Sequence, residues 1–274
     1  MIKDIVVVLG EEGERAGPIA ISLAAAFDAA LSGICVVPEA PLDTFAYAQV
    51  SYEMVASARE EAQEAAQAAS GRFEDQARQA GLPVECSSIC AALPLAAERL
   101  ADAVRISDLI VIEQPDRERR RPSDTLLETV LLRSGRPALI VPYIQKGPMR
   151  FAQATVAWDG SPTAARALAD ALPLLRRADR VEVVNVVREG EEEEEQDFGP
   201  RLVRHLARHG VSAEFRRLPS AIPIADTILS HVADSGSDFL VMGAYGHSRI
   251  REALLGGTSR GILEAMTIPV LMSH

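Results

Sequence analysis

Apolar residues in the second half of the chain follow two alternating patterns. Short continuous apolar runs, typical of strands buried on both faces of a sheet, alternate with longer segments whose apolar residues recur at helical spacing. The expected strands are 155–158, 181–187, 213–218, 239–242 and 269–272, and the expected helices are 163–175, 197–209, 224–235 and 259–265. Strands that alternate with helices in this way predict a parallel sheet with helices on both faces.

The first half of the chain repeats this order of elements. Residues 106–116 (ISDLIVIEQPD) are similar to residues 236–246 (GSDFLVMGAYG), and this match aligns Asp108 with Asp238. Two further pairs of similar segments are 134–142 with 265–273, and 4–10 with 154–160. An internal repeat of this length predicts two structural units of one kind.

The two copies meet in a breaker-rich stretch at 145–148, which suits a linker. We therefore expect two tandem doubly wound parallel-sheet α/β domains, 1–146 and 147–274. The first copy has one expansion, because residues 56–79 are rich in Ala, Glu, Gln and Arg and predict a long helix.

Composition narrows the functional class. The chain has 274 residues, 48% of them hydrophobic, and a formal net charge of −11. An acidic chain lacks the basic footprint of a dedicated nucleic-acid binder, and no apolar run reaches the roughly 20 residues of a membrane-spanning helix. The start of the chain lacks the features of a secretion signal, and its three cysteines do not make a disulfide framework. We expect a cytoplasmic protein that binds neither nucleic acid nor membrane.

Glycines gather after the fourth strand of the second half. Gly243 and Gly246 follow that strand, and Gly256 and Gly257 precede the last helix, which begins at Thr258. In an open parallel sheet, ligands bind at the carboxyl ends of the strands where the winding reverses. Glycines let the backbone approach a ligand closely, and the N–H groups that open a helix attract an anion. Glycines at strand ends also serve simply as turns, so the spacing alone leaves both interpretations open.

Asp159 ends the first strand of the second half, where its carboxylate would accept hydrogen bonds from ribose hydroxyls or hold a metal ion. The P-loop motif G-x-x-x-x-G-K-[ST] is absent from the sequence, and the first strand is not followed by G-x-G-x-x-G. Lys3 and Lys146 are the only lysines. A phosphate site in this half would therefore use backbone amides and arginines.

These residues resemble the universal stress protein family, whose nucleotide-binding members carry G-2x-G-9x-G-[ST] between the fourth strand and the last helix. Gly243, Gly246 and Gly256 match this spacing, and residues 159–161 (DGS) match the family's first-strand motif. The resemblance covers the chain as two tandem copies. It implies a Rossmann-like fold of the adenine nucleotide alpha hydrolase type, with the last strands of the two copies, 138–141 and 269–272, paired as a pseudo-dimer within one chain.

The resemblance also implies the residues of an ATP site in the second half. Asp159 would face the ribose and is the candidate metal ligand for Mg²⁺ or Mn²⁺, and Gly243 would lie beside the ribose. The adenine would lie between Val186 and Met242. The residues implied to hold the phosphates are Gly246, Gly256, Gly257 and Thr258. One departure is visible, since Gly257 occupies the usual [ST] position and Thr258 follows it.

The first half has lost this motif. Its first strand leads into Gly10-Glu11-Glu12-Gly13, and the first glycine loop is replaced by residues 113–116 (EQPD). Carboxylates repel an anionic ligand at close range, and a proline supplies no amide donor. We predict that this half binds no ATP, so that a bulky residue at Gly246 or Gly256 abolishes all nucleotide binding.

The sequence thus predicts an ATP-binding stress-response or signalling protein, with nucleotide in its second half only. Binding of adenine nucleotide, further dimerisation of the chain and an unidentified protein partner are expected. Two alternatives stay open: a weak metal-dependent ATPase or phosphotransferase, and a ligand-free scaffold. No catalytic residue is identified, because no general base or lysine accompanies the glycines.

Several other features keep two interpretations. The acidic run Glu189–Glu195 and the basic run Arg117–Arg121 fit solvated loops or docking segments. Cys35, Cys86 and Cys90 fit core packing, with a redox pair of Cys86 and Cys90 or a metal site as the alternatives.

Overall fold

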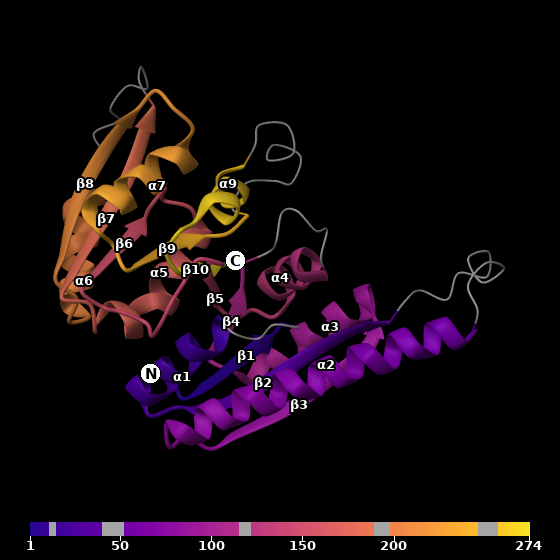
Figure 1. Ribbon diagram of the computed structural model, residues 1–274. Coiled ribbons are helices and arrows are strands. Elements are labelled where there is room, and N and C mark those ends of the chain that lie inside the picture. The colour runs from indigo at the N-terminus through magenta and orange to yellow at the C-terminus, as the bar shows by residue number, and fades with distance from the viewer. Residues whose placement is uncertain (11–14, 40–51, 115–121, 189–197, 246–256) are drawn as a thin grey trace. The chain divides into compact units, whose positions relative to one another are not determined.

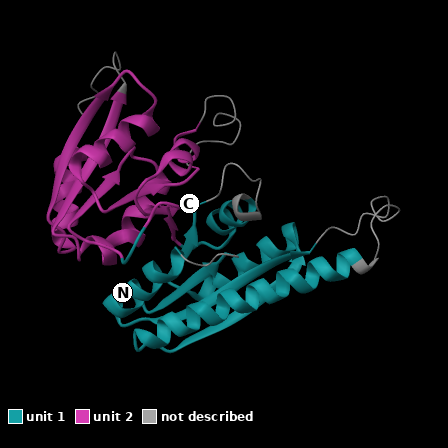
Figure 2. Cartoon of the chain, viewed as in Figure 1, with its two compact units in different colours: residues 1–136, 146–148 teal, residues 137–145, 149–274 magenta. Residues whose placement is uncertain are grey.

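The structure is a computed structural model of residues 1–274, and it describes all of them except 11–14, 40–51, 115–121, 189–197 and 246–256 (Figure 1). The chain divides into two compact units (Figure 2). The first unit is Met1–Arg136 with Lys146–Pro148, and the second is Pro137–Gln145 with Met149–His274.

The first unit is a parallel sheet between two layers of helices. Its strands lie in the order β3-β2-β1-β4. Helix α1 contacts α2 and the strands β1, β2 and β4, and α2 contacts the strands β2 and β3. Helix α3 contacts α4 and the strands β2 and β3. The strands are β1 (Asp4–Leu9), β2 (Ala30–Glu39), β3 (Val84–Ala92) and β4 (Leu109–Glu113), and the helices are α1 (Ala16–Phe27), α2 (Tyr52–Gln79), α3 (Leu93–Ala103), the short 3-10 helix η1 (Val104–Ile106) and α4 (Pro122–Arg133).

The second unit has the same winding with two added strands. Its strands lie in the order β5-β10-β9-β6-β7-β8, and all pair in parallel except β5 with β10. The strands are β5 (Ala138–Val141), β6 (Gln153–Ala157), β7 (Arg180–Arg188), β8 (Ala213–Ser220), β9 (Phe239–Gly243) and β10 (Val270–Ser273), and the helices are α5 (Pro162–Leu175), α6 (Phe198–Arg208), α7 (Ile224–Ser235) and α9 (Thr258–Ala265). The prediction of two doubly wound α/β halves is confirmed.

The strand β5 comes from the first sequence copy but pairs within the second unit. Ile140 lies opposite Val270 and Leu139 opposite Leu271, in antiparallel register. All four residues of β5 and all four of β10 are buried. The predicted pairing of the last strands of the two copies within one chain is confirmed.

Asp108 and Asp238, which the internal repeat aligns, accept equivalent backbone hydrogen bonds in their respective units. Oδ2 of Asp108 accepts hydrogen bonds from the backbone N–H groups of Lys3 (2.7 Å) and Asp4 (3.1 Å). Oδ2 of Asp238 accepts from Ala152 (2.7 Å) and Gln153 (3.1 Å). Each carboxylate therefore satisfies two donors at the start of its unit's first strand, which explains why both copies carry aspartate here.

Replacing Asp238 with alanine is expected to lower the free energy of unfolding of the second unit by about 2–3 kcal/mol, because two backbone donors lose a charged acceptor. The matched control is Asp234→Ala, which removes an exposed carboxylate from α7 and should change stability by less than about 0.5 kcal/mol. Urea unfolding of both variants measures the difference. Equal stability of the two variants would show that the Asp238 hydrogen bonds are not needed.

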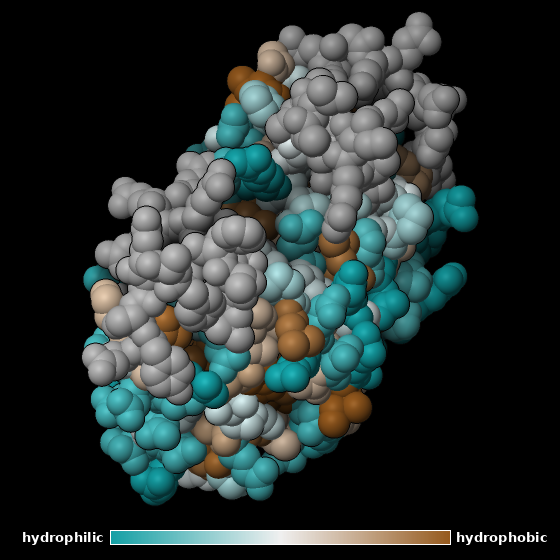
Figure 3. Space-filling model, turned by 90° about the vertical axis from the view of Figure 1, so that its right-hand side faces the viewer, coloured by the Kyte–Doolittle hydropathy of each residue, from teal (hydrophilic) through white to brown (hydrophobic). Residues whose placement is uncertain are grey.

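Surface composition follows the usual pattern of folded domains. The described surface in the view of Figure 3 is mainly hydrophilic, with hydrophobic residues interspersed. Exposed apolar side chains such as Leu95, Ile106 and Tyr143 occur, and scattered examples are normal on protein surfaces. Within the described parts of the chain, every helix is too short or too polar to cross a membrane.

Candidate functional site

The winding of the second unit reverses at β6. The chain passes from β6 through α5 to β7 on one side, whereas β9 pairs with the opposite side of β6. Val156 lies between its register partners Val183 and Val241, so the ends of these three strands reach the same edge of the sheet. Such a reversal is where open α/β sheets bind ligands.

The segment after β6 forms a tight turn and a helix cap. Oδ1 of Asp159 accepts a hydrogen bond from the Ser161 N–H (2.9 Å), and Gly160 adopts a left-handed backbone with φ of +77°. The Ser161 hydroxyl caps α5 by accepting from the Ala164 N–H (3.1 Å). Asp159 is exposed, and its Oδ2 has no partner among the residues that the structure describes. A carboxylate oxygen at the candidate edge is therefore open to a ligand.

Gly243, at the end of β9, is required by packing inside the protein. A Cβ at this position would lie 2.6 Å from the Ala164 nitrogen and 2.7 Å from the Thr163 hydroxyl oxygen, both in the first turn of α5. The absence of a side chain thus allows α5 to approach β9. This reason differs from the close approach to a ligand that the sequence predicts, and it needs no ligand.

The backbone beyond β9 takes an unusual course. The Ala244 N–H donates to the Ser273 carbonyl (2.8 Å), which extends the contact between β9 and β10. Tyr245 then adopts φ of +52°, a left-handed conformation that costs energy for a residue with a side chain. Its N–H donates to the buried Ser259 hydroxyl of α9 (3.1 Å). Tyr245 and Ser259 together fix the exit of the chain from β9.

Among the residues that the structure describes, no side chain caps the backbone donors at the start of α9. Gly257 is its N-cap residue and makes no side-chain hydrogen bond, and Thr258 is its first residue. Both are partly exposed. The first N–H groups of a helix lack partners within the helix and carry the positive end of its dipole, so this end favours an anion.

The two residues predicted to flank an adenine lie on strands on either side of β6. Met242 is one position beyond Val241 on β9 and is 5% exposed. Val186 is half-buried near the end of β7, two positions beyond Val184, which pairs with Ala157. By this register the two side chains share one face of the sheet.

Some predicted residues lie outside the described part of the chain. These are Gly246 and Gly256, together with the charged runs Glu189–Glu195 and Arg117–Arg121. Among the described residues, no three His, Cys, Asp or Glu side chains are grouped as a metal site. Asp159 is the one predicted metal ligand, and its role stays a prediction.

The corresponding edge of the first unit is occupied by its own carboxylate. Glu113 ends β4 at the position of Gly243 in the repeat. Its Oε1 accepts hydrogen bonds from the N–H groups of Arg15 (3.3 Å) and Ala16 (3.4 Å) at the start of α1. Its Oε2 lies 3.2 Å from where a Cβ on Gly10 would be. The carboxylate of Glu113 thus accepts hydrogen bonds from the backbone N–H groups at the start of α1.

The cysteines of the first unit do not form the redox pair considered from the sequence. Cys86 and Cys90 are four residues apart on β3, which corresponds to roughly 13 Å along a strand. A disulfide needs Cα atoms within about 7 Å. Cys35 is buried and packs in the core as predicted, whereas Cys86 and Cys90 are only partly buried.

Alkylation of Cys86 by iodoacetamide at pH 8 is expected to be roughly a thousandfold slower in the folded chain than in urea, since only the thiolate reacts. Burial, assisted by the nearby Glu74 carboxylate, raises the pKa of the Cys86 thiol to about 12. The rate in the folded protein should therefore climb until the pH approaches about 12. Mass spectrometry of the labelled peptide measures both rates, and equal rates at pH 8 would contradict this account.

Comparison with known proteins gives the family of the second unit. The sequence profile described as "Universal stress protein family" matches residues 151–274. Residues 151–274 belong to the universal stress protein family. This universal stress protein domain contains Asp159, Gly243 and the start of α9, and the first unit lies outside the matched range.

Solved structures share the fold of the chain. A universal stress protein from Archaeoglobus fulgidus DSM 4304 has a similar structure, with a TM-score of 0.73 at 16% identity over 98% of this chain and 95% of that chain. A functionally unknown protein from Pseudomonas aeruginosa PAO1 has a TM-score of 0.56 at 16% identity over 99% of this chain and 92% of that chain. At these identities the likeness shows the fold.

A sequence relative is a universal stress protein from Synechocystis sp., which is 44% identical over 46 residues, or 17% of this chain. The matched stretch spans 16% of the length of that relative.

Proposed function

We propose that this chain is a stress-response module that binds one ATP, in its second unit only. The proposal rests on three features of the second unit, whose sheet reverses its winding at β6: the open carboxylate oxygen of Asp159, the close approach of Gly243 to the first turn of α5, and the start of α9. Membership of residues 151–274 in the universal stress protein family supports the choice of an adenine nucleotide.

Each part of the site suits one part of ATP. The open carboxylate oxygen of Asp159 accepts hydrogen bonds from ribose hydroxyls, while its other oxygen holds the turn to Ser161. The backbone donors that begin α9, at Gly257 and Thr258, attract phosphate. Gly246 and Gly256, which the sequence predicts to hold the phosphates, are also included in the proposed site.

The adenine and the metal ion are proposed on narrower grounds. Val186 and Met242 offer apolar surface from two strands on one face of the sheet, which suits a flat, weakly polar base. Mg²⁺ or Mn²⁺ would arrive with the phosphates, since it is usually held by one or two carboxylates and by substrate oxygens. Asp159 is the carboxylate proposed for it.

The first unit is proposed to bind no nucleotide because Glu113 already serves the start of α1. Its carboxylate accepts from Arg15 and Ala16, so a negative charge is fixed at the position that Gly243 has in the second unit. A second negative charge within a few ångströms of this carboxylate would be repelled. Without a nucleotide of its own, the first unit would serve as a structural scaffold for the second unit.

ATP is proposed to act as a switch and not as a substrate. A ligand shifts a conformational equilibrium only when it binds the two states with different affinity, so occupancy would change the chain around 188–198 and 243–258 and, through it, the binding of a protein partner. Dimerisation of the chain and a cytoplasmic location stay predictions from the sequence.

The identity of the nucleotide tests this proposal directly. Mass spectrometry of the small molecules that accompany the purified chain should detect ATP, and a turnover assay with Mg²⁺ or Mn²⁺ should show no steady release of ADP. Steady ADP release would support the weak ATPase, and an absence of nucleotide together with failure to bind added ATP would support the ligand-free scaffold.

A further inference from the structure

The first unit differs from the second at the contact between its outer helix and its outer strand. In the second unit this contact is apolar and tight: the Phe215 ring of β8 lies 2.5 Å from where a Cβ on Gly199 of α6 would be. Phe215 also meets the Phe198 ring edge-on, with centroids 5.4 Å apart. Small or aromatic residues thus fill the space between α6 and β8.

The strand register identifies the residue that replaces Phe215 in the first unit. In the second unit, Phe215 of β8 pairs with Val183 of β7. Gly33 of β2 has the position in the first unit that Val183 has in the second, and Gly33 pairs with Cys86 of β3. Cys86 is therefore the structural equivalent of Phe215. Two further positions along β3 facing the same way are Ser88 and Cys90, so three small polar or thiol side chains face the helix where the second unit has an aromatic ring.

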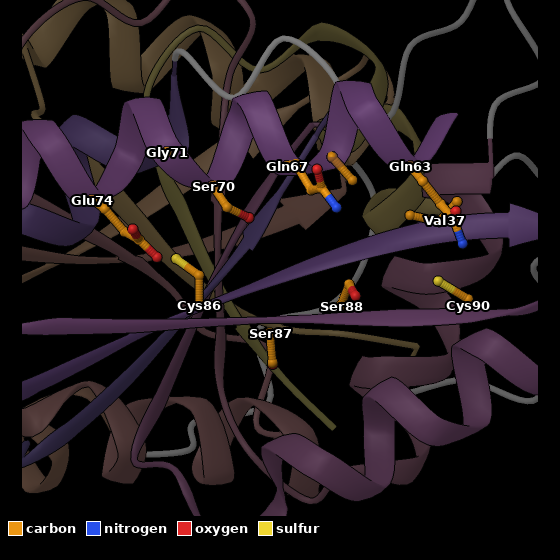
Figure 4. A pocket seen from close by; sticks show the side chains of 11 residues that line it. Val37, Gln63, Gln67, Ser70, Gly71, Glu74, Cys86, Ser87, Ser88 and Cys90 are labelled. Carbon is orange, nitrogen blue, oxygen red and sulfur yellow. The ribbon is translucent and has the colours of Figure 1, made fainter. Parts of the chain in front are cut away.

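A cavity of about 440 Å³ occupies this space between α2 and β3. Figure 4 shows Cys86, Ser88 and Cys90 pointing from the strand toward the helix, and side chains of α2 pointing toward the strand. The side chains that line it from α2 and are polar are Gln63, Gln67, Ser70 and Glu74. A volume of this size accommodates a small organic molecule, and the lining selects a hydrophilic one.

The cavity is held open by apolar packing on another face of α2. Ala69, Phe73 and Ala77, spaced four residues apart along the helix, are each at most 2% exposed. The Phe73 ring lies within 3.2 Å of where Cβ atoms on Gly17 and Gly33 would be, so the helix sits closely on α1 and β2. Because this contact fixes α2, the cavity is formed before any ligand arrives.

The lining carries one formal charge, that of Glu74. Its carboxylate lies near the Cys86 thiol and helps to raise the pKa of that thiol, and among the described residues it forms no ion pair. Ser70 is bonded within the protein, since its hydroxyl lies 3.3 Å from the Cys35 sulfur. The amides of Gln63 and Gln67 have no hydrogen-bond partner in the part of the chain that the structure describes, and so present donors and acceptors to a ligand.

We propose that the cavity between α2 and β3 is a second ligand site, which takes a small hydroxylated compound carrying an ammonium group. Glu74 pairs with the ammonium group. Gln63, Gln67 and Ser88 form hydrogen bonds with the hydroxyls. The net charge of −11 favours the approach of a cation over that of an anion. This site is independent of ATP binding in the second unit.

Three sugars of similar size test the charge preference in the full chain. Amide chemical shifts of residues 63–74 and 84–92 are followed while glucosamine, glucose or glucuronate is added. Glucosamine is expected to give saturable shifts, glucose to bind about tenfold more weakly, and glucuronate to give none. Glu74→Gln should weaken glucosamine about tenfold and leave glucose unchanged. The control, Glu85→Gln, removes an exposed carboxylate that alternates to the other face of β3 and should change neither.

A second pair of variants tests the location without removing a charge. Ser88→Tyr fills the cavity and should abolish the glucosamine shifts. Ser87 also borders the cavity, but its side chain points away from α2 in Figure 4, so Ser87→Tyr should keep the shifts. Both positions are exposed on β3, so both variants should unfold at the same urea concentration as the natural chain. Unsaturable shifts, equal affinity for the three sugars, or glucosamine binding that survives both Glu74→Gln and Ser88→Tyr would overturn the proposal.

Discussion

Replacing Gly243 with alanine is expected to destabilise the second unit by about 1–3 kcal/mol, because the added methyl group must displace the backbone of α5. Its nearest atoms would be the Ala164 nitrogen at 2.6 Å and the Thr163 carbonyl carbon at 2.7 Å. Neither belongs to a flexible side chain. The first turn of α5 carries Ser161 and follows Asp159, so the same change should weaken ATP binding.

Gly71→Ala provides the matched control for this variant. Gly71 lies inside α2, and no atom lies within 4 Å of where its Cβ would be. Alanine there should stabilise the first unit by about 0.5–1 kcal/mol, as expected for a helix interior. Urea unfolding followed separately in each unit, for example by hydrogen exchange, measures both effects. Unchanged stability of the second unit in Gly243→Ala would contradict the claim that the close approach of α5 to β9 requires glycine at this position.

Replacing Asp159 with alanine is expected to weaken ATP binding about 10- to 100-fold, the range for losing hydrogen bonds to a charged group. The carboxylate is exposed at the candidate edge, and only its Oδ1 is committed to Ser161. Isothermal titration calorimetry with ATP measures the change. Asp159→Asn retains an oxygen acceptor for the Ser161 N–H, so it should keep the turn and lose affinity less severely.

The control for this effect is Asp170→Ala in α5, where the partly buried carboxylate pairs with Arg166 at 3.0 Å. It should leave ATP affinity unchanged and cost less than about 1 kcal/mol in stability. Unchanged ATP affinity in Asp159→Ala would rule out a contact between this carboxylate and the nucleotide.

Much of the fold is predictable because buried parallel strands have a strong sequence signal. The expected strand 239–242 and helix 163–175 appear as β9 (Phe239–Gly243) and α5 (Pro162–Leu175). The long helix expected at 56–79 is α2 (Tyr52–Gln79). These segments combine continuous apolar runs or helical spacing with clear turn residues, so local pattern and burial agree.

Other features depend on contacts between residues far apart in the sequence. The alignment of Asp108 with Asp238 was visible, but their shared role at the start of the first strands required the structure. Gly243 was expected to serve a ligand, and its contact with α5 could not be read from spacing. The left-handed conformation of Tyr245 was also hidden, because glycine and not tyrosine is the usual residue there.

The loss of the glycine motif in the first half was evident, but its structural consequence was not. The sequence predicts that Glu113 repels phosphate. The structure shows in addition that the carboxylate accepts hydrogen bonds from the start of α1. The cavity beside Cys86 was likewise hidden, since it results from a small side chain on β3 and polar positions on α2 together.

The number of ATP molecules bound by one chain tests the central claim most directly. Equilibrium dialysis with radiolabelled ATP at saturating concentration measures it, with protein concentration determined by amino-acid analysis. One ATP per chain is predicted, because the edge of the second unit has an open Asp159 carboxylate and an uncapped α9, while the edge of the first unit is occupied by Glu113. Two ATP molecules per chain, or none, would contradict the account.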